Sequence, residues 1–161
     1  MWRFALCILL LIGGGPALAG EIECRPSAAP SLKTAEEIFI ALFRSFSYVS
    51  DQEQFGVEDD KRSYAHVVRC GGKFRDDCDG FALTARDLLQ AAGYQAWVVT
   101  VDQRKVSPDA KNVSAADYGT HMFAAFLDVD GVVKTLDNRY IGIRTYDNTI
   151  SGSRYRNPVI R

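Results

Sequence analysis

The order of its hydrophobic patterns is the feature that most constrains how this chain can fold. Apolar residues recur at helical spacing in two stretches, one after Thr34 and one after Asp77. Beyond Gly93 the pattern changes, and the stretches there are rich in aromatic and β-branched residues typical of strands. Helices first and strands afterwards is the order of the α+β class, in which helices pack on an antiparallel sheet. We therefore expect an α+β fold.

Both predicted helices have recognisable ends. Thr34 to Glu37 is a capping box, in which two side chains satisfy backbone N–H groups at a helix N-terminus. The second helix is expected to begin around Cys78, with Asp76 or Asp77 as its N-cap, and to end at Gly93. The two apolar stripes are Ala35, Ile38, Phe39, Leu42, Phe43 and Phe46 in the first helix, and Phe81, Ala85, Leu88, Leu89 and Ala92 in the second.

The predicted strands are 94–101, 121–129 and 132–136, with a weaker candidate at 140–146. Asp130-Gly131, between the second and third of these, indicates a hairpin. Residues 47–75 are polar with scattered apolar residues, so we expect loops there, with room for one short helix. Residues 102–120 are polar and long enough for a surface loop beside a functional site.

The start of the chain has the pattern of a secretory signal peptide at residues 1–19. Arg3 precedes nine apolar residues, Phe4 to Ile12, and Ala17-Leu18-Ala19 fits a small-x-small cleavage site. Nine residues are far fewer than the roughly 20 needed to cross a bilayer, so we expect export and no membrane span in the mature chain. Residues 20–33 are expected to form an irregular leader, and residues 34–161 one domain with a hydrophobic core.

The charge of the chain limits its expected partners, and its cysteine content limits the possible disulfides. Without residues 1–19 the chain has 18 basic and 20 acidic residues, which predicts neither a nucleic acid nor an anionic membrane as a partner. In an oxidising compartment Cys24, Cys70 and Cys78 cannot all pair internally. Either Cys24 pairs with Cys70 and Cys78 is a free thiol, or Cys70 pairs with Cys78 and Cys24 is free.

Cys78 and His121 are candidates for nucleophilic chemistry. The first turn of a helix favours a thiolate, whereas neighbouring carboxylates such as Asp77 and Asp79 raise the pKa of a thiol. We expect a cationic imidazole to outweigh those carboxylates and keep a thiolate well below the usual pKa of about 8.5. His121 is followed by an apolar strand, an unfavourable place for an imidazole without a function, although a buried, hydrogen-bonded histidine is the more common case.

Asp137, 16 residues after His121, could orient that imidazole if the hairpin has the right register. A two-residue loop at Asp130-Gly131 would pair Ala124 with Asp137 and place the aspartate on the face opposite His121. A three-residue loop, 129–131 with a left-handed glycine, would pair His121 with Arg139 and place Asp137 on the same face as His121. In the simpler alternative, Asp137-Asn138 is only a turn.

Three segments resemble the bacterial transglutaminase-like cysteine proteinases, a family that includes LapG-type periplasmic proteases. They are Asp76-Asp77-Cys78-Asp79-Gly80-Phe81-Ala82, His121-Met122 and Thr135-Leu136-Asp137-Asn138. The resemblance implies a papain- or transglutaminase-like core with N-terminal helices packed on an antiparallel sheet. It also implies that Cys78 is the nucleophile, His121 the acid and base, and Asp137 the orienting group. With Cys78 assigned to catalysis, we predict that Cys24 and Cys70 form the disulfide.

The resemblance further implies an exported cysteine peptidase, periplasmic or secreted, that acts on a protein or peptide and is regulated by a membrane protein. No cofactor is required, but the family often has two acidic residues after the nucleophile as part of a calcium site. Here Gly80 takes the second of these positions, so calcium would use Asp77, Asp79 and backbone carbonyls. Tyr64 is a candidate oxyanion donor beside the Cys78 N–H. The alternatives are transglutaminase-type acyl transfer and a non-catalytic binding module with the same fold.

Overall fold

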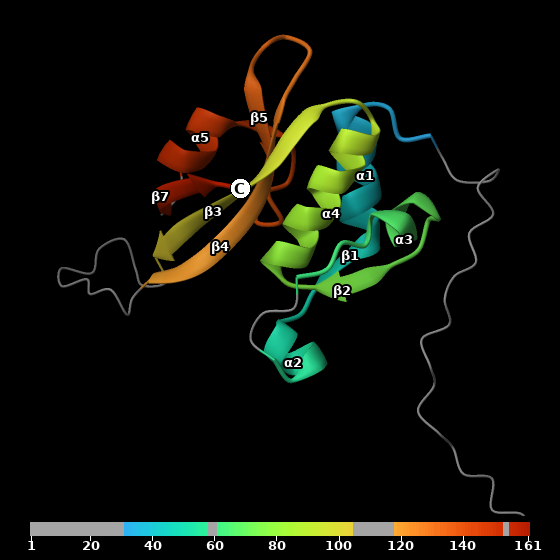
Figure 1. Ribbon diagram of the computed structural model, residues 1–161, viewed down its shortest axis with the longest axis vertical. Helices are drawn as coiled ribbons and strands as arrows, with labels where there is room; N and C mark the ends of the chain where they lie inside the picture. Colours follow the sequence, from blue (N-terminus) through green and yellow to red (C-terminus); the bar gives the residue numbers. More distant parts are fainter. Residues whose placement is uncertain (1–30, 58–60, 105–117, 153–154) are drawn as a thin grey trace, which may run out of the picture.

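The computed structural model describes residues 31–57, 61–104, 118–152 and 155–161, and within them helices cover both faces of an antiparallel sheet (Figure 1). The helices are α1 (Ala35–Ser45), α2 (Asp51–Phe55), α3 (Ala65–Arg69), α4 (Cys78–Ala91) and α5 (Tyr146–Ser151). The strands are β1 (Phe46–Tyr48), β2 (Phe74–Asp76), β3 (Gln95–Arg104), β4 (Tyr118–Leu127), β5 (Val133–Leu136), β6 (Arg144–Thr145) and β7 (Tyr155–Ile160). The predicted α+β class is confirmed.

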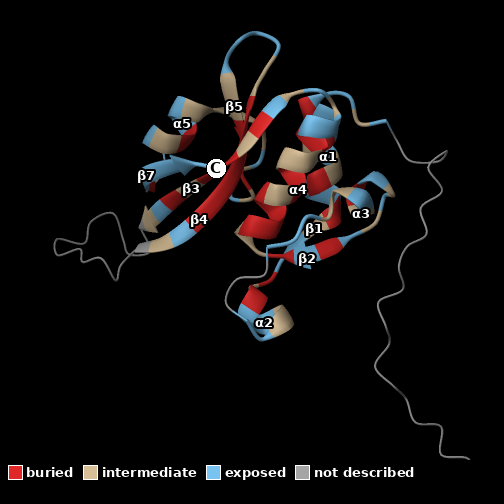
Figure 2. Ribbon diagram, viewed as in Figure 1, coloured by how far each residue is buried: buried red, intermediate tan, exposed pale blue. Residues whose placement is uncertain are grey.

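Five strands form the main sheet, in the order β6-β5-β4-β3-β7, with all neighbours antiparallel. Helix α4 packs on β3 and β4, and α5 packs near β5, β6 and β7. The short strands β1 and β2 form a separate parallel pair. Buried residues lie along β4 and on the side of α4 that faces the sheet (Figure 2).

Both predicted helix starts are confirmed. Thr34 accepts a hydrogen bond from the Glu37 N–H at 3.2 Å, and the Glu37 carboxylate accepts one from the Thr34 N–H at 3.1 Å. Asp77 caps α4 by accepting from the Asp79 N–H at 3.1 Å. The predicted apolar stripe of α1 was wrong at Phe43, which is 61 % exposed. Phe43 lies one residue, or about 100°, round the helix from the buried Leu42.

The hairpin between β4 and β5 has the three-residue loop. Ala124 pairs with Leu136 and Leu127 with Val133, and the Asp128 N–H donates to the Val132 carbonyl at 3.0 Å. Gly131 has φ +77°, the left-handed conformation that glycine adopts without steric cost. This register excludes the two-residue alternative and places Asp137 on the same side of the sheet as His121.

Several elements were not predicted, and all are short. The segment 47–75 contains α2, α3 and most of the β1–β2 pair, and the predicted strand 140–146 shrinks to β6 because Thr145 caps α5. The ends of the predicted loop 102–120 extend β3 and β4, while 105–117 lie outside the described residues. The predicted signal peptide and all but the last three residues of the leader also lie outside them. Among the described helices, none is both long and apolar enough to cross a bilayer.

Candidate active site

Cys78 is the first residue of α4 and is a half-buried free thiol. Its sulfur lies against the backbone N–H of Met122 in β4 and its own N–H, both of which would hydrogen-bond to a thiolate. Met122 directly follows His121 in β4, so this contact brings the thiol close to the residue that carries the imidazole. Cys78 and His121 also line one cavity together.

His121 and Asp137 form a buried pair. The His121 Nε2 lies 3.0 Å from the Asp137 Oδ1, and each residue is only 3 % exposed. An ionised carboxylate can only accept hydrogen bonds, so Nε2 must be the donor. The basic nitrogen of a neutral His121 is then Nδ1, which leaves it available to take a proton from a thiol.

Asp137 is itself held by two further donors. Its Oδ1 accepts from the Arg139 N–H at 3.0 Å, and its Oδ2 accepts from the Tyr155 hydroxyl at 2.7 Å. The Tyr155 ring also stacks on the His121 ring, with centroids 5.2 Å apart. Burial, followed by the charge of Asp137, raises the pKa of Tyr155, so the phenol remains a donor. Sequence analysis missed Tyr155, because β7 has only one buried residue and no apolar alternation.

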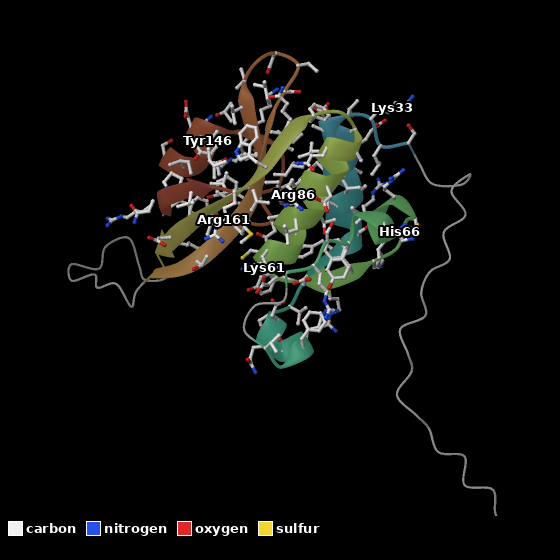
Figure 3. The ribbon with its side chains drawn as sticks, in the orientation of Figure 1. Lys33, Lys61, His66, Arg86, Tyr146 and Arg161 are labelled. Atoms are coloured by element: carbon white, nitrogen blue, oxygen red, sulfur yellow. The ribbon has the colours of Figure 1, made fainter. Side chains whose placement is uncertain are left out.

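Two cavities meet at Cys78, each of about 410 Å³. They share Cys78 and Thr120, so the thiol lies between two hollows. The aromatic cavity is lined by Phe46, Tyr48, Cys78, Gln103, Thr120, His121, Asn138 and Arg139. The charged cavity is lined by Lys61, Asp77, Cys78, Asp79, Thr100, Thr120, Met122 and Arg161. Lys61 and Arg161 lie near the N-terminal end of α4 in Figure 3.

The surroundings of Cys78 oppose a preformed thiolate. Burial, followed by the charges of Asp77 and Asp79, raises the pKa of the Cys78 thiol to about 12, although the N–H groups of Met122 and Cys78 act against this. The expected thiolate at mildly acidic pH is therefore not supported. At neutral pH a thiol with such a pKa keeps its proton.

Four aspartates converge beside the thiol: Asp51, Asp76, Asp77 and Asp79 each place one carboxylate oxygen within 4.8 Å of the others. Burial raises the pKa of Asp76 to about 6, and the hydrogen bond with Asp51 acts in the same direction, against hydrogen bonds from the Asp77 N–H and Tyr64. A protonated Asp76 can donate the hydrogen bond that joins it to Asp51. Carboxylate oxygens are also the ligands that Ca²⁺ prefers.

The position of the Asp76 carboxylate explains why residue 80 is a glycine. A Cβ at this position would lie 2.3 Å from the Asp76 Oδ2, closer than atoms can approach. The Asp76 carboxylate thus fills the space in which a side chain at position 80 would begin. The structure places an acidic group beside Gly80 from β2 instead of from α4 itself.

The remaining residues considered for the site are Tyr64, His66 and Cys70. Tyr64 stacks on Phe74 at 4.7 Å and hydrogen-bonds to Asp76, so the structure does not support it as the oxyanion donor. His66 lies on α3, away from the start of α4 (Figure 3). Cys70 is disulfide-bonded and Cys78 is not, which excludes the Cys70–Cys78 alternative. The predicted partner, Cys24, lies outside the described residues.

Comparison with known proteins does not assign the chain to a family. Neither a protein-family model nor a curated protein matches the sequence.

We predict that Asp77→Asn accelerates alkylation of Cys78. Asparagine keeps the N-cap but removes the charge, so the thiol pKa falls and the thiolate fraction at a fixed pH rises. Each unit by which the pKa falls should raise the iodoacetamide rate about tenfold at about pH 8. Asp87→Asn, which removes a charge paired with Arg86 on the same helix, is the control and should leave the rate unchanged. A slower or unaltered rate in Asp77→Asn would contradict the electrostatic account.

Proposed function

We propose that this protein is an exported cysteine peptidase with a papain- or transglutaminase-like core. The observation that supports this most is the buried His121–Asp137 pair, because His121 lines one cavity together with Cys78. A nucleophile, a base and a group that orients the base are the parts required for covalent acyl chemistry. A binding module with the same fold would have no use for them.

In the proposed reaction, the Cys78 sulfur bonds to the carbonyl carbon of a peptide while its proton passes to Nδ1 of His121. The carbonyl π electrons move to oxygen, and Asp137 stabilises the imidazolium. Collapse of this intermediate breaks the C–N bond, and His121 returns the proton to the leaving amine. Water then attacks the thioester with His121 as base. Cleavage of the S–C bond releases the acid, and the imidazolium returns its proton to the sulfur.

The two cavities favour an extended peptide over a small substrate. Cys78 lies where they meet, so chain on both sides of a scissile bond could be accommodated.

Export of the protein, to a periplasm or beyond the cell, is part of this proposal. The disulfide at Cys70 supports it, because disulfides persist in oxidising compartments and are rare in the cytosol. The free Cys78 is then the cysteine retained for its chemistry.

We predict that Cys78→Ala abolishes proteolysis, whereas Asp137→Asn lowers it by about 10²- to 10⁴-fold and keeps the fold. Asparagine cannot stabilise the imidazolium and does not fix its tautomer. Mapping of new protein N-termini after the exported protein fraction is incubated with each variant measures this. Asp128→Asn, at an aspartate paired with Lys134 in the hairpin, is the matched control.

The peptidase proposal would be contradicted if Cys78→Ala produced the same new N-termini as the wild-type protein. Near-normal cleavage by Asp137→Asn would contradict it as well. A primary amine is added in a parallel reaction. If the amine appears in the products and the cleavage products decline, the same triad performs acyl transfer instead of hydrolysis.

We also propose that the cluster Asp51, Asp76, Asp77 and Asp79 holds Ca²⁺ without being a required cofactor site. A bound cation would offset the negative charge that raises the pKa of Cys78.

Ca²⁺ should raise the unfolding temperature more at neutral pH than at roughly pH 5, where the Asp76 carboxyl, with a pKa of about 6, is protonated. Calorimetry with Ca²⁺, Mg²⁺ and EDTA tests this. An unfolding temperature that does not respond to Ca²⁺ at either pH would exclude the site.

A further inference from the structure

Acyl chemistry at Cys78 needs hydrogen-bond donors for the oxygen that becomes negative during attack. Such donors are usually worth several kcal/mol of transition-state stabilisation. The backbone N–H of Cys78 is one candidate, since it opens α4 and lies beside the sulfur. A second donor has to come from a group that lines the same cavity.

The β1–β2 pair places Tyr48 at this cavity. Tyr48 pairs with Asp76, two residues before Cys78, and the Val49 N–H donates to the Asp76 carbonyl at 3.0 Å. Successive strand residues point to opposite sides, so Phe46 and Tyr48 share one side. Both line the aromatic cavity together with Cys78 and His121.

The Tyr48 side chain has the exposure and charge state that a donor to substrate requires. It is 65 % exposed, so its hydroxyl remains accessible to a bound molecule. Partial burial, followed by the charges of Asp77 and Cys78, raises the pKa of Tyr48, so the phenol keeps its proton.

We propose that the Tyr48 hydroxyl, together with the Cys78 N–H, stabilises the oxyanion formed when the Cys78 sulfur attacks an acyl carbon. The assignment rests on the peptidase function proposed above. As the S–C bond forms, the carbonyl π pair moves to oxygen, and Tyr48 donates a hydrogen bond to it without giving up its proton. When the oxyanion collapses and the leaving group departs, that hydrogen bond weakens again.

Gln103 is another neutral donor in the lining of the same cavity, and it provides a matched comparison. It lies on β3 opposite Gly119, on a different element from Tyr48. Gln103→Leu and Tyr48→Phe each remove one donor from the cavity at similar side-chain size. Tyr146→Phe, in a separate cavity that Cys78 does not line, controls for loss of a phenol elsewhere.

The test compares two reactions of Cys78 in the purified full chain. Acylation by p-nitrophenyl acetate forms an oxyanion, whereas alkylation by iodoacetamide at the same thiol does not. Tyr48→Phe should slow acylation by about 10²-fold and leave alkylation unchanged. Tyr146→Phe should leave both rates near those of the wild type, and Gln103→Leu should slow acylation less than Tyr48→Phe does.

Each other outcome has a distinct meaning. If Tyr48→Phe slows both reactions equally, Tyr48 acts on the thiol and the oxyanion assignment is overturned. If only Gln103→Leu slows acylation, or no variant does, the assignment is equally overturned. A wild-type protein that is alkylated but not acylated at Cys78 contradicts the proposed function itself, and the role of Tyr48 fails with it.

Discussion

The hydrogen bond between His121 and Asp137 is the interaction on which the site depends. Both side chains are buried, where an unpaired charge or imidazole would be costly, so each needs the other. The three-residue hairpin loop sets the register that brings them to one face, and Tyr155 satisfies the second carboxylate oxygen. The sheet and these hydrogen bonds therefore hold the imidazole of His121 in a fixed orientation.

The surroundings of Cys78 do not favour its thiolate form. A helix N-terminus and two N–H groups favour a negative sulfur, but burial and two adjacent carboxylates oppose it and raise the pKa of Cys78 to about 12. The balance favours a neutral resting thiol. In the reaction proposed above, deprotonation is then coupled to attack, and a cation bound by the aspartate cluster would shift the balance toward the thiolate.

Local patterns predicted well the parts of this fold that local interactions determine. The capping box at Thr34, the N-cap at Asp77 and the left-handed Gly131 all lie within a few residues of the structure they specify. The parallel pairing of Phe46 with Phe74 and the approach of Tyr155 to Asp137 join distant segments, and no local signal encodes them. That is why sequence analysis proposed Tyr64 as the oxyanion donor, whereas the pairing of β1 with β2 leads us to propose Tyr48. The geometry of the His121–Asp137 pair could be predicted only as one of two hairpin registers.

The central claim is that His121 removes the proton from Cys78 as an acyl group is transferred to the sulfur. Mass spectrometry of the peptide that contains Cys78, after rapid quenching of a reaction with an activated ester, tests it most directly. The account predicts an acyl adduct on Cys78 that forms and decays in the wild-type protein and forms about 10²- to 10⁴-fold more slowly in His121→Ala. An adduct that forms equally fast in His121→Ala, or that appears on another residue, would contradict it.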